Sequence, residues 1–504
     1  MARTVAELGL LDGLALGPRP DPGARIEAIA VDSRKVGPGS LFAALKGVNV
    51  DGATFVETAV KQGAAGILTS LDGALRARDL LGDWPVPVFV DPEPRRRLAQ
   101  LAAAFSGAQP AVMVAATGTN GKTSVASFTR QIWAALGRKA SNFGTAGVEG
   151  HGATGKVSLT TPEPIALHAL LAELTEAGTT HCAMEASSHG LAQFRLDGVR
   201  LRAAAFTNLS RDHLDYHPDA ADYAAAKMRL FAELLPAEGV AVTNADDETA
   251  RIAAEIARAR GLRVIEFGDN ADADGLRLIA QDADLSGQSL RIGWAGQSKL
   301  IRLSLIGRFQ GANALCAAGL VIGAGEDPED VLLALESLRS VRGRMELAAR
   351  RANGAGIFVD YSHTPDSLSV ALAALRPHTP GRLHVVFGAG GDRDPGKRPL
   401  MGETAASGAD RVIVTDDNPR SEDPAAIRAA VLKGCPEAEE VGDRAEAILR
   451  GVDALGPGDC LLVAGKGHET GQEVMGQIHP FDDAEQARAA VGALDGEAGE
   501  AGPF

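Results

Sequence analysis

Apolar, β-branched runs that end in polar residues recur along the chain and predict buried parallel strands. In the middle of the chain they are "PAVMVAATG", "THCAMEA", "RAAAFTN" and "GVAVTNADD", each followed by polar residues and a helical pattern. After about Val341 the alternation starts again with "GIFVDYSH", "RLHVVFGAGGD", "RVIVTDD" and "CLLVAGKGHE". Continuous apolar strands that alternate with helices are typical of parallel sheets covered on both faces. The pattern predicts an α/β protein whose ligands bind at the carboxyl ends of these strands.

Two further regions have patterns of their own. The first hundred residues mix the strand-like runs "RIEAIAVDSR", "GAAGILTS" and "VPVFVDP" with helical stretches, which indicates a smaller α/β domain. The stretch "DADLSGQSLRIGWAGQSKLIRLSLIG" alternates apolar and polar residues, as antiparallel strands of a side sheet do. Because 504 residues exceed the size of a single core, we expect two to four domains, and the pattern indicates three, over residues 1–105, 106–340 and 341–504.

Composition and charge narrow the classes of function. The chain is 45% hydrophobic and 23% charged, with a formal net charge of −15. A nucleic-acid surface needs a basic stripe, so an acidic chain favours a small soluble substrate over nucleic acid. Four cysteines without a C-x-x-C pair suit a reducing cytoplasm. No run approaches the about 18 apolar residues of a membrane helix, so we expect no membrane insertion and no signal peptide.

The segment "AATGTNGKTS" follows a predicted strand and opens a predicted helix, as a phosphate-binding loop does. Its main-chain N–H groups can cradle phosphates, Lys122 can reach the terminal ones and Thr123 can hold Mg²⁺. Ala116 stands where the usual pattern has its first glycine. The competing interpretation is a chance Gly-Lys turn. The expected ATP-binding residues are Gly118, Thr119, Asn120, Gly121, Lys122, Thr123 and Ser124.

Polar residues also cluster behind the next two predicted strands. Glu185 ends one strand, and His213 lies in the segment after the other. Both are candidate ligands for a second metal ion, which would help to neutralise phosphate charge. Taken singly, each could be a surface polar group or a hydrogen-bonded histidine, and only the clustering at strand ends favours function.

The ordered motifs of the chain resemble those of the Mur ligases, which extend the peptide of the peptidoglycan precursor. The resemblance spans roughly residues 30 to 475 and rests on "TGTNGKTS", "EASSHGL", "FTNLSRDHLDYH", "AAKMRLF", "GRFQGANAL", "GRMEL", "VDYSHTPDSL", "GAGGDRDPGKRP", "DNPRSEDP" and "GKGHE". It is greatest for the members that add the third amino acid. Such enzymes have an N-terminal domain for the uridine end of the substrate, a central P-loop ATPase with a parallel sheet, and a C-terminal Rossmann-like domain for the incoming amino acid.

The resemblance also implies roles for individual residues. The expected catalytic residues are Lys122, Glu185, His213 and Lys227, with Lys227 carbamylated to N6-carboxylysine. Asn313, Arg344 and His363, with Asn244 and Asp360, match positions around the nucleotide. The residues expected to bind UDP-N-acetylmuramoyl-L-alanyl-D-glutamate are Ser33, Thr160, Thr161, Ser187, Gln193 and Arg195. Ala53 and Gln310 depart from the family pattern, near the uridine and near ATP respectively.

The implied reaction activates a carboxylate, which is a poor electrophile by itself. The γ-phosphoryl group of ATP passes to the D-glutamyl γ-carboxylate, and the amine of the third amino acid attacks the resulting acyl phosphate. The P-loop and Mg²⁺ gather anions that would otherwise repel one another, and closure of the domains protects the intermediate from water. The expected setting is a cytoplasmic monomer.

The motif "DNPR" indicates the third amino acid. meso-Diaminopimelate has a distal carboxylate and a distal ammonium, to which Arg420 on one side and Asp417, Asn418 and Glu469 on the other are complementary. The full set expected to bind it is Arg393, Asp417, Asn418, Pro419, Arg420, Gly465 and Glu469.

Several alternatives remain open at this point. One alternative is an L-lysine-adding ligase of the same family, which would need no site for a distal carboxylate. Another is a folylpolyglutamate synthetase, which shares the P-loop and the domain order. A non-catalytic P-loop nucleotide-binding regulator would not need Lys122, Glu185, His213 and Lys227 together. A nucleic-acid motor conflicts with the acidic charge.

Overall fold

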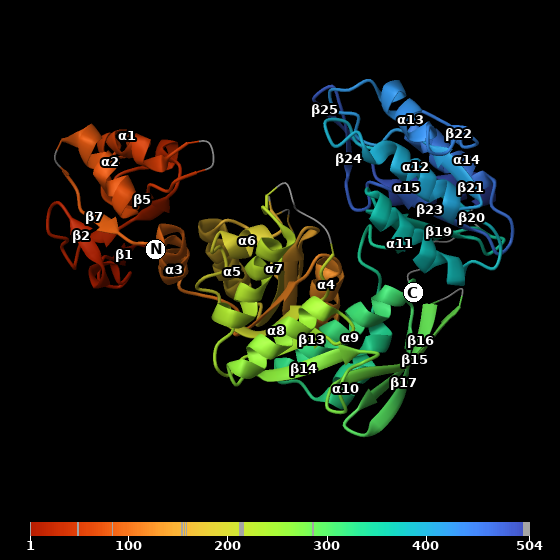
Figure 1. Ribbon diagram of the computed structural model, residues 1–504, viewed down its shortest axis with the longest axis horizontal. Coiled ribbons are helices and arrows are strands. Elements are labelled where there is room, and N and C mark those ends of the chain that lie inside the picture. Colours follow the sequence, from red (N-terminus) through yellow and green to blue (C-terminus); the bar gives the residue numbers. More distant parts are fainter. Residues whose placement is uncertain are drawn as a thin grey trace. The chain divides into compact units, whose positions relative to one another are not determined.

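The computed structural model describes residues 2–47, 50–82, 84–152, 155, 157, 159–210, 216–284 and 287–496. The chain divides into two compact units. The first comprises Met1–Lys122, Gly137–Ile265 and Leu320–Gly325, and the second comprises Thr123–Leu136, Glu266–Gly319 and Glu326–Phe504. Both units contain strands of β-sheets (Figure 1), and hydrophobic cores pack on these sheets.

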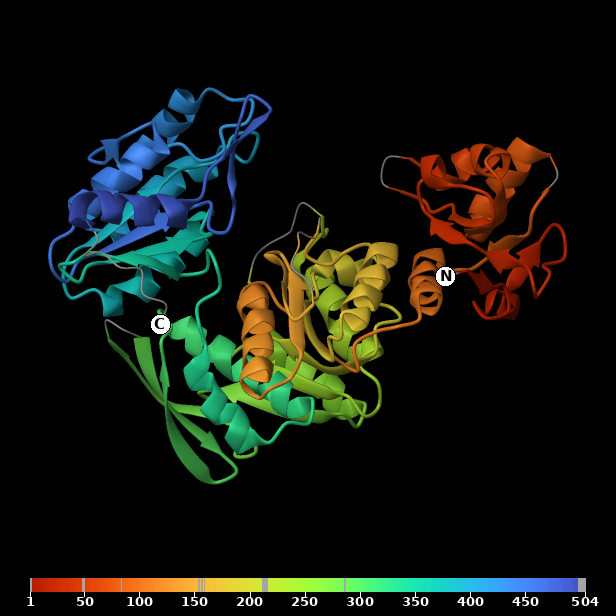
Figure 2. The same cartoon turned by 180° about the vertical axis from the view of Figure 1, so that it is seen from behind.

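The first unit begins with a five-stranded sheet in the order β2-β7-β6-β5-β4, seen from its two sides in Figures 1 and 2. Its strands are parallel except for β2, which is antiparallel to β7. Alternate residues face opposite ways, so that Phe42 and Ile67 pack on α1 and α2 while Leu41 and Leu68 pack on α3. The bounds are β1 Arg3–Thr4, β2 Leu14–Leu16, β3 Arg25–Ile26, β4 Ala28–Ala30, β5 Ser40–Ala43, α1 Val56–Lys61, β6 Ala64–Thr69, α2 Leu71–Leu81, β7 Val88–Val90 and α3 Pro94–Ser106.

A longer run of neighbouring strands, part of a ten-stranded sheet, follows in the order β10-β9-β11-β8-β12-β13-β14. β9, β11, β8, β12 and β13 run parallel, so their carboxyl ends share one edge. Helices α5 to α8 contribute to the core on this sheet. The bounds are β8 Val112–Thr117, β9 Ala140–Gly144, β10 Gly147–Gly150, α5 Pro164–Glu176, β11 His181–Glu185, α6 Ser188–Ala192, β12 Leu201–Phe206, α7 Ala220–Arg229, β13 Val240–Asn244, α8 Glu248–Ala259 and β14 Arg263–Gly268.

The second unit contains the predicted side sheet and a second parallel sheet. β15, β16 and β17 form an antiparallel meander, as the alternating pattern predicts. The other sheet has the order β18-β19-β23-β20-β21-β22 and is parallel except for β18. The bounds are α4 Lys122–Ala135, β15 Leu276–Asp284, β16 Gly287–Trp294, β17 Gln297–Leu303, α9 Arg308–Gly323, α10 Pro328–Ala334, β18 Glu346–Arg350, β19 Gly356–Asp360, α11 Pro365–Leu375, β20 Leu383–Phe387, α12 Lys397–Gly408, β21 Arg411–Val414, α13 Pro424–Leu432, β22 Glu439–Glu440, α14 Arg444–Asp453, β23 Cys460–Ala464, β24 Gly471–Val474, β25 Gln477–Pro480 and α15 Asp483–Asp495.

Helices cover both faces of this six-stranded sheet. Val385 and Leu462 point to the core formed with α11, α12 and α13, whereas Val386 and Leu461 point to the core formed with α14 and α15. The α/β class and the parallel sheets are therefore confirmed, while the domain bounds 1–105, 106–340 and 341–504 stay predictions. None of the helices formed by the described residues is long and apolar enough to cross a membrane.

A fully buried ion pair joins α14 to α15 and should matter strongly for stability. Arg444 Nε and Nη2 donate to the two carboxylate oxygens of Asp483, each at 2.7 Å, and both side chains have zero exposure. We expect Arg444→Met to destabilise the protein by about 3–5 kcal/mol, because it leaves Asp483 buried without its counter-charge. Urea unfolding of the full-length protein measures the change. Arg450→Ala on the exposed face of α14 is the matched control, and an equal effect of both variants would contradict the account.

The buried imidazole of His168 on α5 should make stability depend on pH. Burial lowers its pKa to about 4 from the usual 6.5. The folded state therefore binds its proton less readily than the unfolded state, so the stabilisation is complete above about pH 6.5 and is lost as pH falls toward 4. We expect a loss of about 2 kcal/mol between pH 7 and pH 5, measured by urea unfolding. His168→Asn should reduce this slope, and an unchanged slope would contradict the assignment.

Candidate functional site

The glycine-rich loop after β8 has the geometry of a phosphate cradle. Gly118 and Gly121 have φ of 140° and 89°, which side-chain-bearing residues rarely adopt. A Cβ atom at Gly118 would lie 1.9 Å from Thr207 Oγ1. The loop leads directly into α4, which starts at Lys122, so main-chain N–H groups at a helix start are available to an anion. The predicted order of strand, loop and helix is confirmed.

Two of the predicted catalytic lysines meet at this loop. Lys122 Nζ donates to the carbonyl oxygens of Gly118 and Thr119, at 2.9 and 2.7 Å. Lys227 Nζ donates to the same Gly118 oxygen at 2.7 Å, and it lies 4.4 Å from the ring centre of Tyr223. Lys227 is only 1% exposed. The structure thus brings both amines to the main-chain oxygen of Gly118 in this loop.

Glu185 ends β11 as a buried carboxylate whose orientation is fixed. Its Oε1 accepts from the N–H of Thr145 at 2.8 Å, and its Oε2 accepts from Thr145 Oγ1 at 3.2 Å. Gly144 leaves room for it, since a Cβ there would lie 2.0 Å from Glu185 Oε1. His213, the other predicted ligand of this metal ion, lies outside the described residues. Within them, no group of three His, Cys, Asp or Glu side chains has the arrangement of a metal site.

The residues expected to hold the sugar-dipeptide form one hydrogen-bonded network beside Glu185. Thr160 Oγ1 lies 3.0 Å from Thr145 Oγ1, and Thr161 Oγ1 donates to the main-chain oxygen of Glu185 at 2.8 Å. Ser187 donates to Thr161 through both its N–H and its hydroxyl group. The structure therefore joins this part of the predicted set to the end of β11.

Arg195 extends the same network. Its Nη1 donates to the Thr161 oxygen and its Nη2 to Gln193 Oε1, both at 2.8 Å, and Nη2 also pairs with Glu163 at 2.7 Å. Gln193 Nε2 in turn donates to the hydroxyl of Tyr216 at 3.0 Å. The Arg195 side chain is 9% exposed, so its position is set by these contacts. Five of the six residues predicted for the sugar-dipeptide thus lie together.

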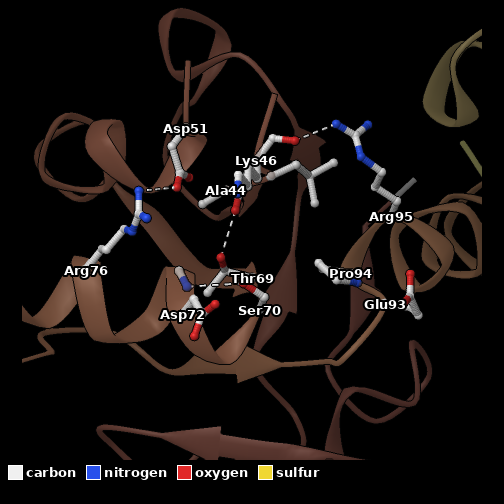
Figure 3. A pocket seen from close by; sticks show the side chains of 12 residues that line it. Ala44, Lys46, Asp51, Thr69, Ser70, Asp72, Arg76, Glu93, Pro94 and Arg95 are labelled. Atoms are coloured by element: carbon white, nitrogen blue, oxygen red, sulfur yellow. Dashed lines mark hydrogen bonds and ion pairs between the residues drawn. The ribbon is translucent and has the colours of Figure 1, made fainter. Parts of the chain in front are cut away.

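The sixth, Ser33, is the buried first residue of a short 3-10 helix, Ser33–Lys35, that follows β4 in the N-terminal region. A cavity of about 260 Å³ opens nearby along the ends of β5 and β6 (Figure 3). Three cations line it, with Arg76 held by Asp51 at 2.9 Å and Arg95 by the Lys46 oxygen at 2.7 Å. Ser33 is not among its lining residues. Three carboxylates, Asp51, Asp72 and Glu93, line the cavity as well, so only the cationic part of its lining suits an anionic ligand.

In the second unit, the loops after β21 and β23 bring together the acidic half of the predicted amino-acid site. Asp417 is 6% exposed, and its Oδ1 has no hydrogen-bond partner. Glu469 Oε2 accepts from Asn418 Nδ2 at 2.8 Å. Gly465 has φ of 119°, and a Cβ there would approach Asp417 Oδ2 to 3.0 Å. The cluster therefore offers a buried carboxylate oxygen that makes no hydrogen bond to the described residues, beside a second carboxylate.

Asn418, which is expected to accept a hydrogen bond from the ligand, makes several hydrogen bonds within the protein. Its Oδ1 accepts from Lys466 Nζ and from the N–H of Glu473, both at 2.9 Å. Its Nδ2 donates to Glu469. The amide is thus engaged within the protein, and it orients Glu469.

Sequence reasoning missed Lys466, which lies at the centre of this cluster. The side chain is fully buried, and its Nζ lies 3.4 Å from Glu469 Oε2 and 3.7 Å from Asp417 Oδ1. One lysine charge beside two carboxylates leaves an excess of negative charge that suits an ammonium group. The available signal was a lysine between two glycines directly after an apolar strand, in "VAGKGHE".

The basic half of this site comes from two loops. Arg420 Nη1 donates to the Gly391 oxygen at 2.7 Å, and its Nε lies 3.3 Å from Glu473 Oε2. Pro419 is buried against the same loop, since a Cβ on Gly391 would lie 1.9 Å from the Pro419 oxygen. Arg393 is exposed and, among the described residues, makes no hydrogen bond or ion pair. The predicted cations therefore differ, with Arg420 fixed in place and Arg393 exposed to solvent.

The nucleotide-side residues of the second unit surround one aromatic ring. The Arg344 guanidinium lies 4.8 Å from the centre of the Tyr361 ring, and the His363 ring centre lies 4.7 Å from it. Asp360 holds the neighbouring turn by accepting from the N–H of Met345 at 2.7 Å, and burial raises the pKa of Asp360. Arg344 and His363 are therefore brought together.

Asn313 makes a hydrogen bond to Gln310, one of the two residues that depart from the family pattern. Its Nδ2 donates to Gln310 Oε1 at 3.0 Å, and both side chains are buried on α9. Gln310, where the family pattern has asparagine, thus reaches the side chain of the expected nucleotide residue. The other departure, Ala53, is fully buried in the N-terminal sheet region.

Comparison with known proteins gives matches along most of the chain. The family model described as "Mur ligase family, catalytic domain" matches residues 25–106, "Mur ligase middle domain" matches residues 116–321, and "Mur ligase, glutamate ligase domain" matches residues 343–467. A relative from Bradyrhizobium diazoefficiens, named UDP-N-acetylmuramoyl-L-alanyl-D-glutamate--2,6-diaminopimelate ligase, is 52% identical over 470 residues, which is 92% of this chain and 95% of the relative. A relative of the same name from Caulobacter vibrioides is 50% identical over 476 residues, 93% of this chain and 96% of the relative.

Solved structures of Mur ligases also match most of the chain. A structure with that same name has a TM-score of 0.73 and 31% identity, and the match covers 98% of this chain and 99% of that one. The MurF ligase of Thermotoga maritima in complex with ADP has a TM-score of 0.59 at 18% identity, covering 92% of this chain and 97% of that one, and shows the shared fold.

Proposed function

The chain belongs to the Mur ligase family, and from this premise we propose that it joins meso-2,6-diaminopimelate to UDP-N-acetylmuramoyl-L-alanyl-D-glutamate with hydrolysis of ATP to ADP. It is thus an ATP-dependent carbon–nitrogen ligase of peptidoglycan precursor synthesis with the three-domain architecture of its family. The relatives that carry this name cover nearly the whole chain at about half identity.

The observation that carries the choice of amino acid is the charge arrangement at the ends of β21 and β23. Arg420 offers guanidinium donors, while Asp417 Oδ1 is a buried acceptor that lacks a hydrogen bond. A distal carboxylate and a distal ammonium on one carbon match such a pair, and L-lysine has no distal carboxylate. The set proposed for the zwitterion is Arg393, Asp417, Pro419, Arg420, Gly465 and Glu469, with Asn418 orienting Glu469.

The P-loop performs the first half of the proposed reaction. Its N–H groups and Lys122 gather the phosphates of ATP and stabilise the charge that develops as the γ-phosphoryl group moves to the D-glutamyl γ-carboxylate. Thr160, Thr161, Ser187, Gln193 and Arg195 would hold that carboxylate and its peptide. The amine of diaminopimelate then attacks the acyl phosphate, and inorganic phosphate leaves.

The residues present fit Mg²⁺ because they offer oxygen atoms, which this ion prefers. Thr123 would hold one ion behind the P-loop, and Glu185 would hold a second, with its carboxylate already oriented by Thr145. Bound Mg²⁺ would supply positive charge to the phosphates. Lys227 would assist as a carbamate, an anion able to ligate or orient Mg²⁺ beside the P-loop.

The N-terminal cavity is the proposed place for the uridine diphosphate end of the substrate. Its lining offers Lys46, Arg76 and Arg95, and cations of this kind suit a diphosphate (Figure 3). Ser33 would add a hydroxyl from the neighbouring strand end. We propose that the enzyme works in the cytoplasm as a monomer, where its nucleotide and amino-acid substrates are available.

The experiment is phosphate release by the purified protein with ATP and Mg²⁺, with each other substrate omitted in turn. We expect turnover only when both UDP-N-acetylmuramoyl-L-alanyl-D-glutamate and meso-diaminopimelate are present. ATP turnover without either of them, or binding without turnover, would instead support a nucleotide-binding regulator.

A further inference from the structure

Arg420 has a backbone conformation that its residue type does not favour. Its φ is +51°, which lies in the left-handed region that glycine adopts without strain. The hairpin of β24 and β25 holds it there, because the Arg420 N–H donates to the Glu473 oxygen at 3.0 Å and its carbonyl accepts from the Met475 N–H at 2.6 Å (Figure 1). An arginine at a position that suits glycine indicates that the side chain is needed.

The Arg420 side chain is held at two of its three nitrogen atoms. Nη1 donates to the Gly391 oxygen at 2.7 Å, and Nε lies 3.3 Å from Glu473 Oε2. In the part of the chain that the structure describes, Nη2 makes no hydrogen bond, whereas Nη1 does. The guanidinium is therefore anchored on one side and leaves Nη2 to donate to a ligand.

We propose that Glu473 is a specificity-determining positioning residue, which fixes the Arg420 guanidinium so that Nη2 faces the distal carboxylate of the incoming amino acid. This inference rests on the proposed function of the site. Glu473 acts through Arg420 and is not a catalytic residue.

Two observations favour positioning by Glu473 over a solvent-exposed charge pair. The same residue provides the main-chain oxygen for the Arg420 N–H, the N–H for Asn418 Oδ1 and the carboxylate for Arg420 Nε. It thereby links the cationic and the acidic halves of the site. The Arg420 side chain is 23% exposed and the Glu473 side chain is 41% exposed, so the ion pair is only partly protected from water and its main-chain contacts carry much of the positioning.

The conformational entropy of the Arg420 side chain also favours this role. An unanchored guanidinium samples many rotamers, and fixing it in advance lowers the entropy lost when a carboxylate binds. Removal of the Glu473 carboxylate should weaken the binding of an amino acid with a distal carboxylate. It should leave the nucleotide and the sugar-dipeptide untouched, because their proposed sites involve other residues.

The test compares Glu473→Ala, Glu473→Gln and the wild-type enzyme in steady-state ligation of meso-diaminopimelate. We expect Glu473→Ala to raise the KM for diaminopimelate about tenfold, with kcat and the other two KM values within about twofold. Glu473→Gln keeps an oxygen acceptor for Nε and should recover part of the loss. Glu446→Ala, which removes an exposed glutamate from its pair with Arg450 on α14, is the matched control.

The outcomes separate this inference from the proposed function. If the wild type does not use diaminopimelate, the proposed function fails. If the wild type uses it and Glu473→Ala has an unchanged KM for it, the positioning role of Glu473 is overturned. A parallel rise of all three KM values in both Glu473 variants would also overturn it, because that result indicates a general structural role. Comparison of the thermal unfolding curves of Glu473→Ala and Glu446→Ala shows whether the Glu473→Ala protein is folded.

Discussion

Replacing Lys122 by alanine should lower kcat for ATP-dependent ligation by about 10³-fold, because the P-loop loses its one side chain that reaches the transferred phosphoryl group. The Lys122 amine lies against the oxygens of Gly118 and Thr119, at the mouth of the loop. The KM for the amino acid should change little, since its proposed site lies on other loops. Steady-state phosphate release at saturating substrates measures the effect.

Lys61→Ala is the matched control for this result. Lys61 is an exposed lysine on α1 whose amine pairs with Glu57 at 2.5 Å, so its loss should leave kcat within about twofold. A Lys122→Ala enzyme with more than about a tenth of wild-type activity would contradict the assignment of this loop to the phosphates.

Replacing Arg420 by alanine should raise the KM for meso-diaminopimelate by about 100-fold, the scale of one lost hydrogen bond between charged groups. Turnover with L-lysine should not fall, because lysine has no distal carboxylate for this side chain. The preference for diaminopimelate over lysine should therefore shrink by a similar factor. Kinetics with both amino acids at fixed ATP and UDP-N-acetylmuramoyl-L-alanyl-D-glutamate measure it.

Two further variants separate the side chain from the backbone at this position. Arg420→Gly adopts φ of +51° without strain, so it should show the same rise in KM if the guanidinium is what matters. Arg420→Lys keeps the charge but not the planar fork, and it should recover only part of the affinity. Arg450→Ala, an exposed arginine on α14, is the control. Equal KM values for Arg420→Ala and the wild type would contradict the zwitterion site.

The sequence predicts much of this fold because the apolar runs are long and uninterrupted. The runs around Val114, Ala183, Val385 and Leu462 are buried strands, as continuous burial in a parallel sheet requires. The P-loop could also be predicted from the sequence, since Gly118 and Gly121 have positive φ values that favour glycine. Local patterns of this kind need no knowledge of distant contacts.

Other features depend on contacts between residues far apart in the chain. Nothing local to Lys466 shows that its amine meets Asn418, and nothing local to Glu473 shows that it meets Arg420. The contacts of Asn418 could not be predicted for the same reason, because its amide bonds to residues that follow β23. The short fully buried strand Ser40–Ala43 has only four residues, too few for a periodic signal.

The central claim is that this enzyme selects an amino acid with a distal zwitterion. The most direct measurement is the ratio of kcat/KM for meso-diaminopimelate to that for L-lysine, with the nucleotide product identified by mass. The account predicts a ratio of at least about 100, which corresponds to the distal carboxylate contact, and a product heavier than the sugar-dipeptide by one diaminopimelate residue. A ratio near one would contradict it.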